Sequence, residues 1–130
     1  MPKHKIIIVD DEVSLSEFIK KSLERIGEFE VHIVNNPLKA LEEMRQFSPD
    51  VAVIDLIMCD KPGSVLIKEM KEEEELRHIP VLLISGMPMF KEMETICKKY
   101  AINVPAGGKA LLEKPFTPEA LRDEINLRLP

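Results

Sequence analysis

Segments dominated by apolar residues alternate along the chain with segments that mix apolar and polar residues. The apolar runs occupy positions 6–9, 31–34, 51–54, 80–84 and 110–113, and the segments between them carry apolar residues at spacings of three and four. The first pattern is typical of short strands and the second of helices with one buried face. We therefore predict a three-layer α/β fold with a doubly wound, five-stranded parallel sheet.

Capping residues indicate where the helices begin and end. Ser14 and Glu17 fit an N-terminal capping box, and Gly27 would end that helix. Asn36-Pro37 and Thr117-Pro118 place proline at the start of two helices, and further helices are predicted from 62–64 onward and over 88–100. The residues expected to face the core are Leu15, Phe18, Ile19, Leu23, Ile26, Leu38, Leu41, Met44, Phe47, Val65, Leu66, Ile67, Met70, Met89, Met93, Ile96, Cys97, Leu121, Ile125 and Leu129.

The composition indicates one soluble globular domain over residues 1–130. Hydrophobic residues make up 45% and charged residues 32% of the chain. Neither a bilayer-spanning run nor a signal peptide is present, so we expect a cytoplasmic protein that does not enter membranes. A net charge of -5 argues against direct binding to nucleic acid. Cys59 and Cys97 lie in no metal-binding spacing and are expected to be free thiols.

Charged side chains follow three of the predicted strands. Asp10 and Asp11 come after the first strand, Asp55 closes the third, and Lys114 follows the fifth. The carboxyl ends of parallel strands meet in one crevice, so these groups should lie together. Two carboxylates about 4 Å apart repel each other by roughly 1–4 kcal/mol, which indicates a bound cation. Oxygen ligands with room for water suit Mg²⁺ or Mn²⁺.

Each of these residues also has an ordinary structural explanation. Acids after a strand can stabilise the start of a helix. Lys114 could be a surface residue or could simply neutralise the acids, and Ser85 could be a helix-entry residue. A metal, a carboxylate nucleophile, a hydroxyl and an ammonium together can accept and hold a phosphoryl group, so the set is more specific than its members.

The ordered set of motifs resembles the receiver domains of two-component response regulators, the CheY-like family. The resemblance covers nearly the whole chain and rests on Val9-Asp10-Asp11-Glu12, Asp55 with Met58 and Gly63, Ile84-Ser85-Gly86, and Lys114-Pro115-Phe116. It implies a flavodoxin-like (βα)5 fold that takes a phosphoryl group from the phosphohistidine of a sensor histidine kinase or a histidine phosphotransfer protein. It also implies a protein that catalyses only its own phosphorylation and dephosphorylation.

The same resemblance implies a role for each residue of the set. Asp55 would be the phosphoacceptor, and Asp11, Asp55 and the backbone carbonyl of Ile57 would hold Mg²⁺. Asp10 would act mainly through metal-bound water. Lys114 would pair with one phosphoryl oxygen and Ser85 would hydrogen-bond another. Signalling to a downstream protein, or self-dimerisation, would use the face built from the fourth helix, the fifth strand and the fifth helix.

The chain departs from the family pattern at several positions. Cys59 stands where the family usually has proline, and Leu111 stands where it usually has the aromatic residue of its switch. Residues 101–109 form an insertion that would reshape the partner-binding face. Ile57 and Met87, which flank the path of the hydrolytic water in this family, are apolar here, so we expect slow self-dephosphorylation.

Two other functions are compatible with the sequence. One is a small phosphohydrolase of the haloacid-dehalogenase type, although its Asp-x-Asp motif and cap domain are missing. The other is an interaction module that keeps the fold and works without phosphorylation, which Leu111 and the altered loop favour. Because the chain stops at Pro130, we expect no effector domain in it.

Overall fold

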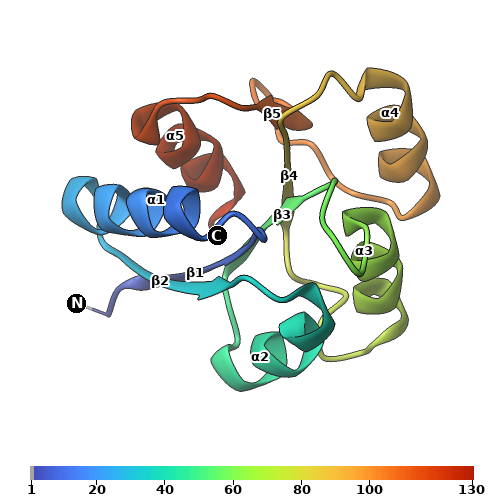
Figure 1. The fold of residues 1–130 in the computed structure, drawn as a ribbon, viewed down its shortest axis with the longest axis horizontal. Helices are drawn as coiled ribbons and strands as arrows, with labels where there is room; N and C mark the ends of the chain where they lie inside the picture. Colours follow the sequence, from blue (N-terminus) through green and yellow to red (C-terminus); the bar gives the residue numbers. More distant parts are fainter. Residues whose placement is uncertain (1) are drawn as a thin grey trace.

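The computed structural model describes residues 2–130, apart from the side chain of Phe90. Its strands form one parallel sheet in the order β2-β1-β3-β4-β5 (Figure 1). They are β1 His4–Val9, β2 Phe29–Val34, β3 Val51–Asp55, β4 Val81–Ser85 and β5 Leu111–Glu113. This architecture confirms the predicted flavodoxin-like fold. The three central strands β1, β3 and β4 are buried apart from His4 and Lys5 at the start of β1, because helices cover both of their faces, as the apolar runs of these strands require.

Helices lie on both faces of the sheet. They are α1 Val13–Ile26, α2 Ala40–Phe47, α3 Gly63–Glu72, α4 Phe90–Lys99 and α5 Pro118–Arg128, with a 3-10 turn, η1, over Pro37–Lys39. Figure 1 shows α1 and α5 on one face and α2, α3 and α4 on the other. Alternate residues of each strand therefore enter two separate cores, Ile6 and Ile8 facing α1 and α5 while Ile7 and Val9 face the other helices.

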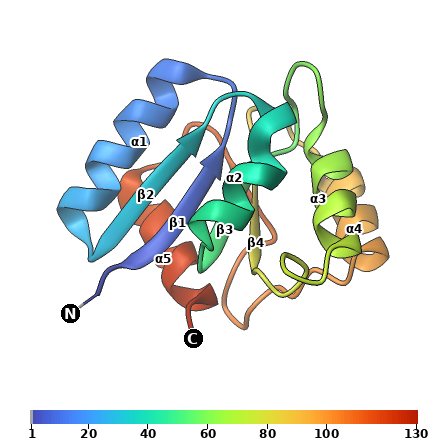
Figure 2. The same ribbon diagram turned by 90° about the horizontal axis from the view of Figure 1, so that it is seen from below.

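The strand order places a crevice above the centre of the sheet. The chain passes from β1 to its neighbour β2 on one side and then to β3 on the other, so the direction of winding reverses at β1. Figure 2 shows β1 and β2 pointing to the end of the molecule where α1 begins and the loop after β3 lies. Ligand sites of open α/β folds form at such reversal points.

The predicted capping box of the first helix is wrong. The helix begins at Val13, and Glu12 occupies the cap position without a side-chain hydrogen bond to the helix. Ser16 is fully buried instead, and its Oγ donates a hydrogen bond of 2.8 Å to the Glu12 carbonyl. A small residue at this position lets α1 lie close to the sheet, so the serine serves packing and not capping. Gly27 does end α1, as predicted.

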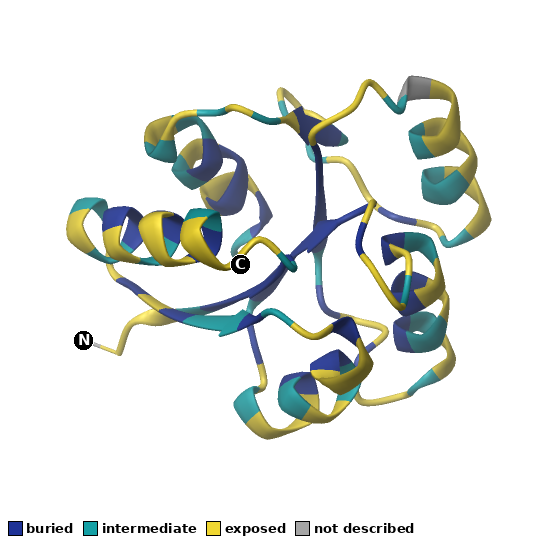
Figure 3. Ribbon diagram, in the orientation of Figure 1, coloured by how far each residue is buried: buried dark blue, intermediate teal, exposed yellow. Residues whose placement is uncertain are grey.

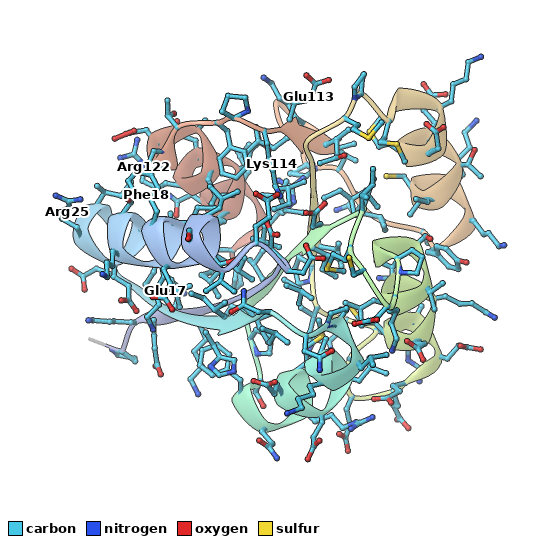
Figure 4. All side chains as sticks on the ribbon, viewed as in Figure 1. Glu17, Phe18, Arg25, Glu113, Lys114 and Arg122 are labelled. Carbon is cyan, nitrogen blue, oxygen red and sulfur yellow. The ribbon has the colours of Figure 1, made fainter. Side chains whose placement is uncertain are left out.

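Three residues predicted to face the core are exposed. Phe18 is 57% exposed on the side of α1 next to α5 (Figure 4), and Leu38 and Val65 are 60% and 42% exposed. The face of α1 that contacts the sheet instead includes Ser16, Ile19, Ser22 and Leu23. The prediction counted only apolar residues, so it missed the two buried serines. The face of α1 predicted to be buried therefore included Phe18, which is exposed.

The other two errors have similar local causes. Leu38 lies in η1, whose tighter turn precedes α2 and changes which residues face inward. Helix α3 buries Gly63, Leu66, Ile67 and Met70, a spacing of three and four that leaves Val65 on the outer side. The caps predicted at Asn36 and Thr117 are both confirmed, since each side chain accepts a backbone N–H two or three residues later.

Helix α4 is the least buried helix of the fold. Figure 3 shows none of its described residues as buried, whereas every other helix has buried positions. Met93, Ile96 and Cys97 pack partly buried against the core next to Leu111. The insertion that follows has no helix or strand between α4 and β5, as expected for residues 101–109. Helix α4 therefore contacts the core through a few partly buried side chains, which include Met93, Ile96 and Cys97.

Candidate functional site

The three predicted carboxylates meet at the carboxyl end of the sheet. Asp10 directly follows β1, Asp11 comes next, and Asp55 is the last residue of β3. One oxygen from each lies within 4.8 Å of an oxygen of the others. Asp10 and Asp55 are 0% and 2% exposed, and Asp11 is partly exposed. The strand ends therefore bring together the acids that the sequence predicted to be neighbours.

Each carboxylate is oriented by a backbone N–H group. Asp10 Oδ1 accepts from the N–H of Glu12 at 2.9 Å, and Asp55 Oδ1 accepts from the N–H of Ile57 at 3.0 Å. Asp11 Oδ2 accepts from the N–H of Cys59 at 2.8 Å. Hydrogen bonds to ionised oxygens are roughly twice as strong as neutral ones, so the loops after β1 and β3 hold the acids in place.

Lys114 extends into this cluster from the end of β5 (Figure 4). Its Nζ donates to Asp55 Oδ2 at 2.8 Å and to Glu12 Oε1 at 2.9 Å. Its backbone N–H also donates to the Ser85 carbonyl at 2.8 Å, which fixes β5 beside β4. Burial opposes the charged ammonium, but the surrounding carboxylates of Asp10, Asp55 and Glu12 outweigh it and raise the pKa of Lys114. Lys114 is therefore a fixed positive charge at neutral pH.

Glu12 was not among the predicted site residues. Its side chain is 60% exposed, yet it contacts Lys114 from the solvent side. The two residues are 102 positions apart in the sequence, so no local pattern could have paired them. The only available signal was the adjacency of Glu12 to Asp10 and Asp11.

The electrostatics of the cluster fit a divalent cation. When Asp10, Asp11, Glu12 and Asp55 are ionised, four negative charges face the single positive charge of Lys114. Burial raises the pKa of Asp55, although the hydrogen bond from Lys114 opposes that effect. Asp10 Oδ2 lies 2.8 Å from Lys114 Nζ, but not in hydrogen-bonding geometry, and this buried oxygen has no hydrogen-bond partner among the described residues. A buried carboxylate oxygen that accepts no hydrogen bond, beside two other carboxylates, is a donor set that suits Mg²⁺ or Mn²⁺.

Gly63 allows the start of α3 to approach the backbone of Asp55. A Cβ at this residue would lie 2.3 Å from the carbonyl oxygen of Asp55 and 2.8 Å from Cα of Leu56. The Gly63 N–H instead donates to the Leu56 carbonyl at 3.0 Å. Only glycine fits here without displacing the backbone that carries Asp55.

The remaining predicted residues lie at the end of β4, in the loops after β3 and β4, and in β5. Ser85 is fully buried at the end of β4, and its Oγ accepts a hydrogen bond of 3.1 Å from the N–H of Met87. Ile57 and Met87 are both exposed large apolar residues, and Cys59 is an exposed free thiol. Leu111 is buried and packs in the core facing α2, α3 and α4. The structure thus has an aliphatic core residue where the family usually has its switch aromatic.

Comparison with known protein families identifies the family of this chain. The family model for the response regulator receiver domain matches residues 6–126. The chain belongs to this family. It is thus a receiver domain of two-component signalling, as the motifs predicted. Because the match covers residues 6–126, it argues against a phosphohydrolase of the haloacid-dehalogenase type. Among residues 2–130, no helix is long and apolar enough to cross a membrane.

Individual relatives agree with this family. The chain is 29% identical over 117 residues to the polar-differentiation response regulator DivK of Brucella anthropi, covering 90% of this chain and 88% of DivK. It is 28% identical over 122 residues to chemotaxis protein CheY-3 of Vibrio cholerae, covering 94% and 88%. The solved structure of CheY4 from Vibrio cholerae superimposes with a TM-score of 0.83 at 23% identity, covering 98% and 99% of the two chains. Three other relatives are longer, and the chain spans 17%, 52% and 12% of their lengths.

Proposed function

We propose that this receiver domain accepts one phosphoryl group on Asp55 from the phosphohistidine of a sensor histidine kinase or histidine phosphotransfer protein. The observation that carries the proposal is the contact of Lys114 Nζ with Asp55 Oδ2 at 2.8 Å, within a cluster of three carboxylates. A nucleophilic carboxylate with a fixed ammonium beside it can hold the negative oxygens of a transferred phosphoryl group.

The transfer conserves all atoms and charges. An oxygen of Asp55 forms a bond to phosphorus while the phosphorus–nitrogen bond of the donor breaks. The electron pair of that bond returns to the imidazole nitrogen of the donor histidine. Lys114 pairs with a phosphoryl oxygen. Ser85 donates its hydroxyl hydrogen to another, while its Oγ can still accept from the Met87 N–H. The chain catalyses only its own phosphorylation and dephosphorylation. Self-dephosphorylation removes the phosphoryl group from Asp55 and so ends the signal, without turnover of a separate substrate.

Receiver domains generally bind Mg²⁺ through an acidic cluster, and the residues here fit that ion. Asp11, Asp55 and the carbonyl of Ile57 would hold it, with Asp10 acting through bound water; Mn²⁺ would suit the same donors. The ion would supply positive charge that offsets the negative charge of the carboxylates and of the incoming phosphoryl group. Asp10, Asp11 and Asp55 keep their orientation through the backbone hydrogen bonds of the loops.

We propose that the output surface is the face formed by α4, β5 and α5. A hollow of about 660 Å³ lies there, lined in part by Met93 of α4, Leu112 of β5 and Ala120 of α5. The weak burial of α4 makes this face able to shift when the loop after Ser85 moves. A downstream protein or a second receiver would dock on it.

Phosphorylation by acetyl phosphate with Mg²⁺ tests the proposal. We expect intact-mass measurements to show one added phosphoryl group, lost in Asp55→Asn and on chelation of the metal. Asp60→Asn is the matched control, because Asp60 is an exposed acid of the same loop with φ of 70°, a backbone conformation that asparagine also tolerates. A phosphoryl group retained by Asp55→Asn, or hydrolysis of many equivalents, would refute it.

A second measurement tests whether the captured group changes the output face. We expect beryllofluoride, which mimics the bound phosphoryl group, to alter hydrogen exchange over 85–114. Beryllofluoride binding without any change in exchange would instead favour the module that works independently of phosphorylation.

A further inference from the structure

The insertion at 101–109 builds one wall of a polar pocket at the other end of the sheet. The pocket holds about 340 Å³ and is lined by residues from the end of α3, the α3–β4 connection, the insertion and the end of α5. Val81, the first residue of β4, lies in its wall, whereas Ser85, the last residue of β4, lies beside the acidic cluster. Four residues of strand separate these positions by about 13 Å. The pocket is therefore distinct from the phosphoacceptor site.

The ionisable residues that line this pocket are all basic. Lys71, Arg77, His78 and Arg128 line it, Asn103 of the insertion adds an amide, and no aspartate or glutamate is among the lining residues. The sign of these side chains is opposite to the net charge of -5 of the whole chain. The neighbouring acids Glu73, Glu74 and Glu75 line a different hollow with Arg45, and Glu73 is already engaged by Arg45 at 2.6 Å.

Lys71 is a partly buried cation of this pocket that has no acidic partner among the described residues. It is partly buried, and its Nζ donates one hydrogen bond of 3.0 Å to the Arg77 carbonyl. No carboxylate of residues 2–130 lies within 4.0 Å of this ammonium. Burial lowers the pKa of Lys71, and no acid counters that effect. Two of its three N–H donors therefore remain for a ligand.

Arg128 supports the pocket from within. Its guanidinium donates to Glu124 Oε1 at 3.0 Å and to the Lys109 carbonyl at 2.7 Å, and the side chain is 2% exposed. These bonds hold the end of the insertion against α5, so the wall that carries Asn103 has a fixed base. The buried Arg128–Glu124 ion pair thus helps to fix the position of the insertion that forms this wall.

We propose that this pocket binds a small anion carrying a phosphate or diphosphate group, with Lys71 as its principal ligand and Arg77 as a second. The volume falls within the range of small-molecule sites, and the pocket is lined by a lysine and an arginine, two residue types that bind phosphate. The binding is separate from phosphorylation of Asp55. An occupied pocket would join the insertion to α3 and stabilise the folded chain by mass action.

An NMR titration of the intact chain with inorganic phosphate, without added divalent metal, tests this site. We expect saturable shifts of backbone amides in 71–81 and 101–105, beyond those caused by sodium chloride at equal ionic strength. Pyrophosphate should bind more tightly because it carries more charge. Lys71→Gln should weaken binding about tenfold, the effect expected for losing one close charge at a partly exposed site.

Two further variants make the outcome decisive. Lys68→Gln removes the same charge from an exposed position of α3 and should leave the affinity unchanged. Arg77→Gln, also at an exposed position, should weaken binding several-fold without unfolding the chain, which guards against a folding defect in Lys71→Gln. Equal losses in Lys68→Gln and Lys71→Gln, shifts confined to residues near Lys114, or shifts that match those of chloride would each overturn the proposal.

Discussion

Replacing Arg128 by leucine should destabilise this protein strongly. The Arg128 side chain is 2% exposed and pairs with Glu124, whose side chain is 10% exposed. The same guanidinium donates to the Glu124 and Lys109 carbonyls at 2.9 Å and 2.7 Å. Glu124 Oε1 in turn accepts from the Lys109 N–H at 2.9 Å. Leucine would leave Glu124 as a buried charge without its cation and would remove the donors of both carbonyls.

The expected cost follows from the burial of the pair. Removing one partner of a buried ion pair costs about 3–5 kcal/mol, because the other charge is left without compensation. An unfolding entropy of about 2.1 cal/mol/K per residue gives roughly 0.27 kcal/mol/K for 130 residues. The Tm of Arg128→Leu should therefore fall by about 11–18 °C. Glu124→Leu together with Arg128→Leu should be no less stable than Arg128→Leu alone, since the unpaired charge is gone.

Urea unfolding followed by circular dichroism, with thermal scans of the same variants, measures these effects. Arg122→Leu is the matched control, because Arg122 lies on the same helix in a more exposed pair with Asp123 and should change stability by less than about 0.5 kcal/mol. A loss of under about 1 kcal/mol in Arg128→Leu would refute the reasoning, because it would mean that water reaches the pair through fraying of the last turn.

Three further predictions concern the acidic cluster. Gly63→Ala should cost about 1–3 kcal/mol in urea unfolding and slow phosphorylation, because a Cβ would overlap the Asp55 carbonyl oxygen; wild-type values for both would contradict this. Glu12→Gln should tighten beryllofluoride binding in fluorine NMR titrations by about two- to fivefold, the range for losing one exposed ion pair that competes for Lys114, and unchanged or weaker binding would count against that competition. The phosphorylated chain should lose its group slowly and Ile57→Asn should lose it faster; a wild-type lifetime of seconds, unaltered in the variant, would show that the exposed apolar side chain does not control water access.

The sequence alone predicted the sheet and the acidic cluster because both depend on local signals. Continuous apolar runs such as 51–54 identify strands that are buried on both faces. A charged residue directly after such a run lies at the carboxyl end of its strand. Parallel strands then bring Asp10, Asp11, Asp55 and Lys114 together, whatever the details of packing.

Tertiary structure alone decided which sides of the helices face the core and which distant charges pair. Phe18 is exposed while Ser16 is buried, because the approach of α1 to the sheet favours a small side chain at that contact. The pairing of Glu12 with Lys114, and the bonds of Arg128 to Lys109, join residues far apart in sequence. Such contacts form only when whole elements have packed, so their energies are set by burial that no local pattern of residues encodes.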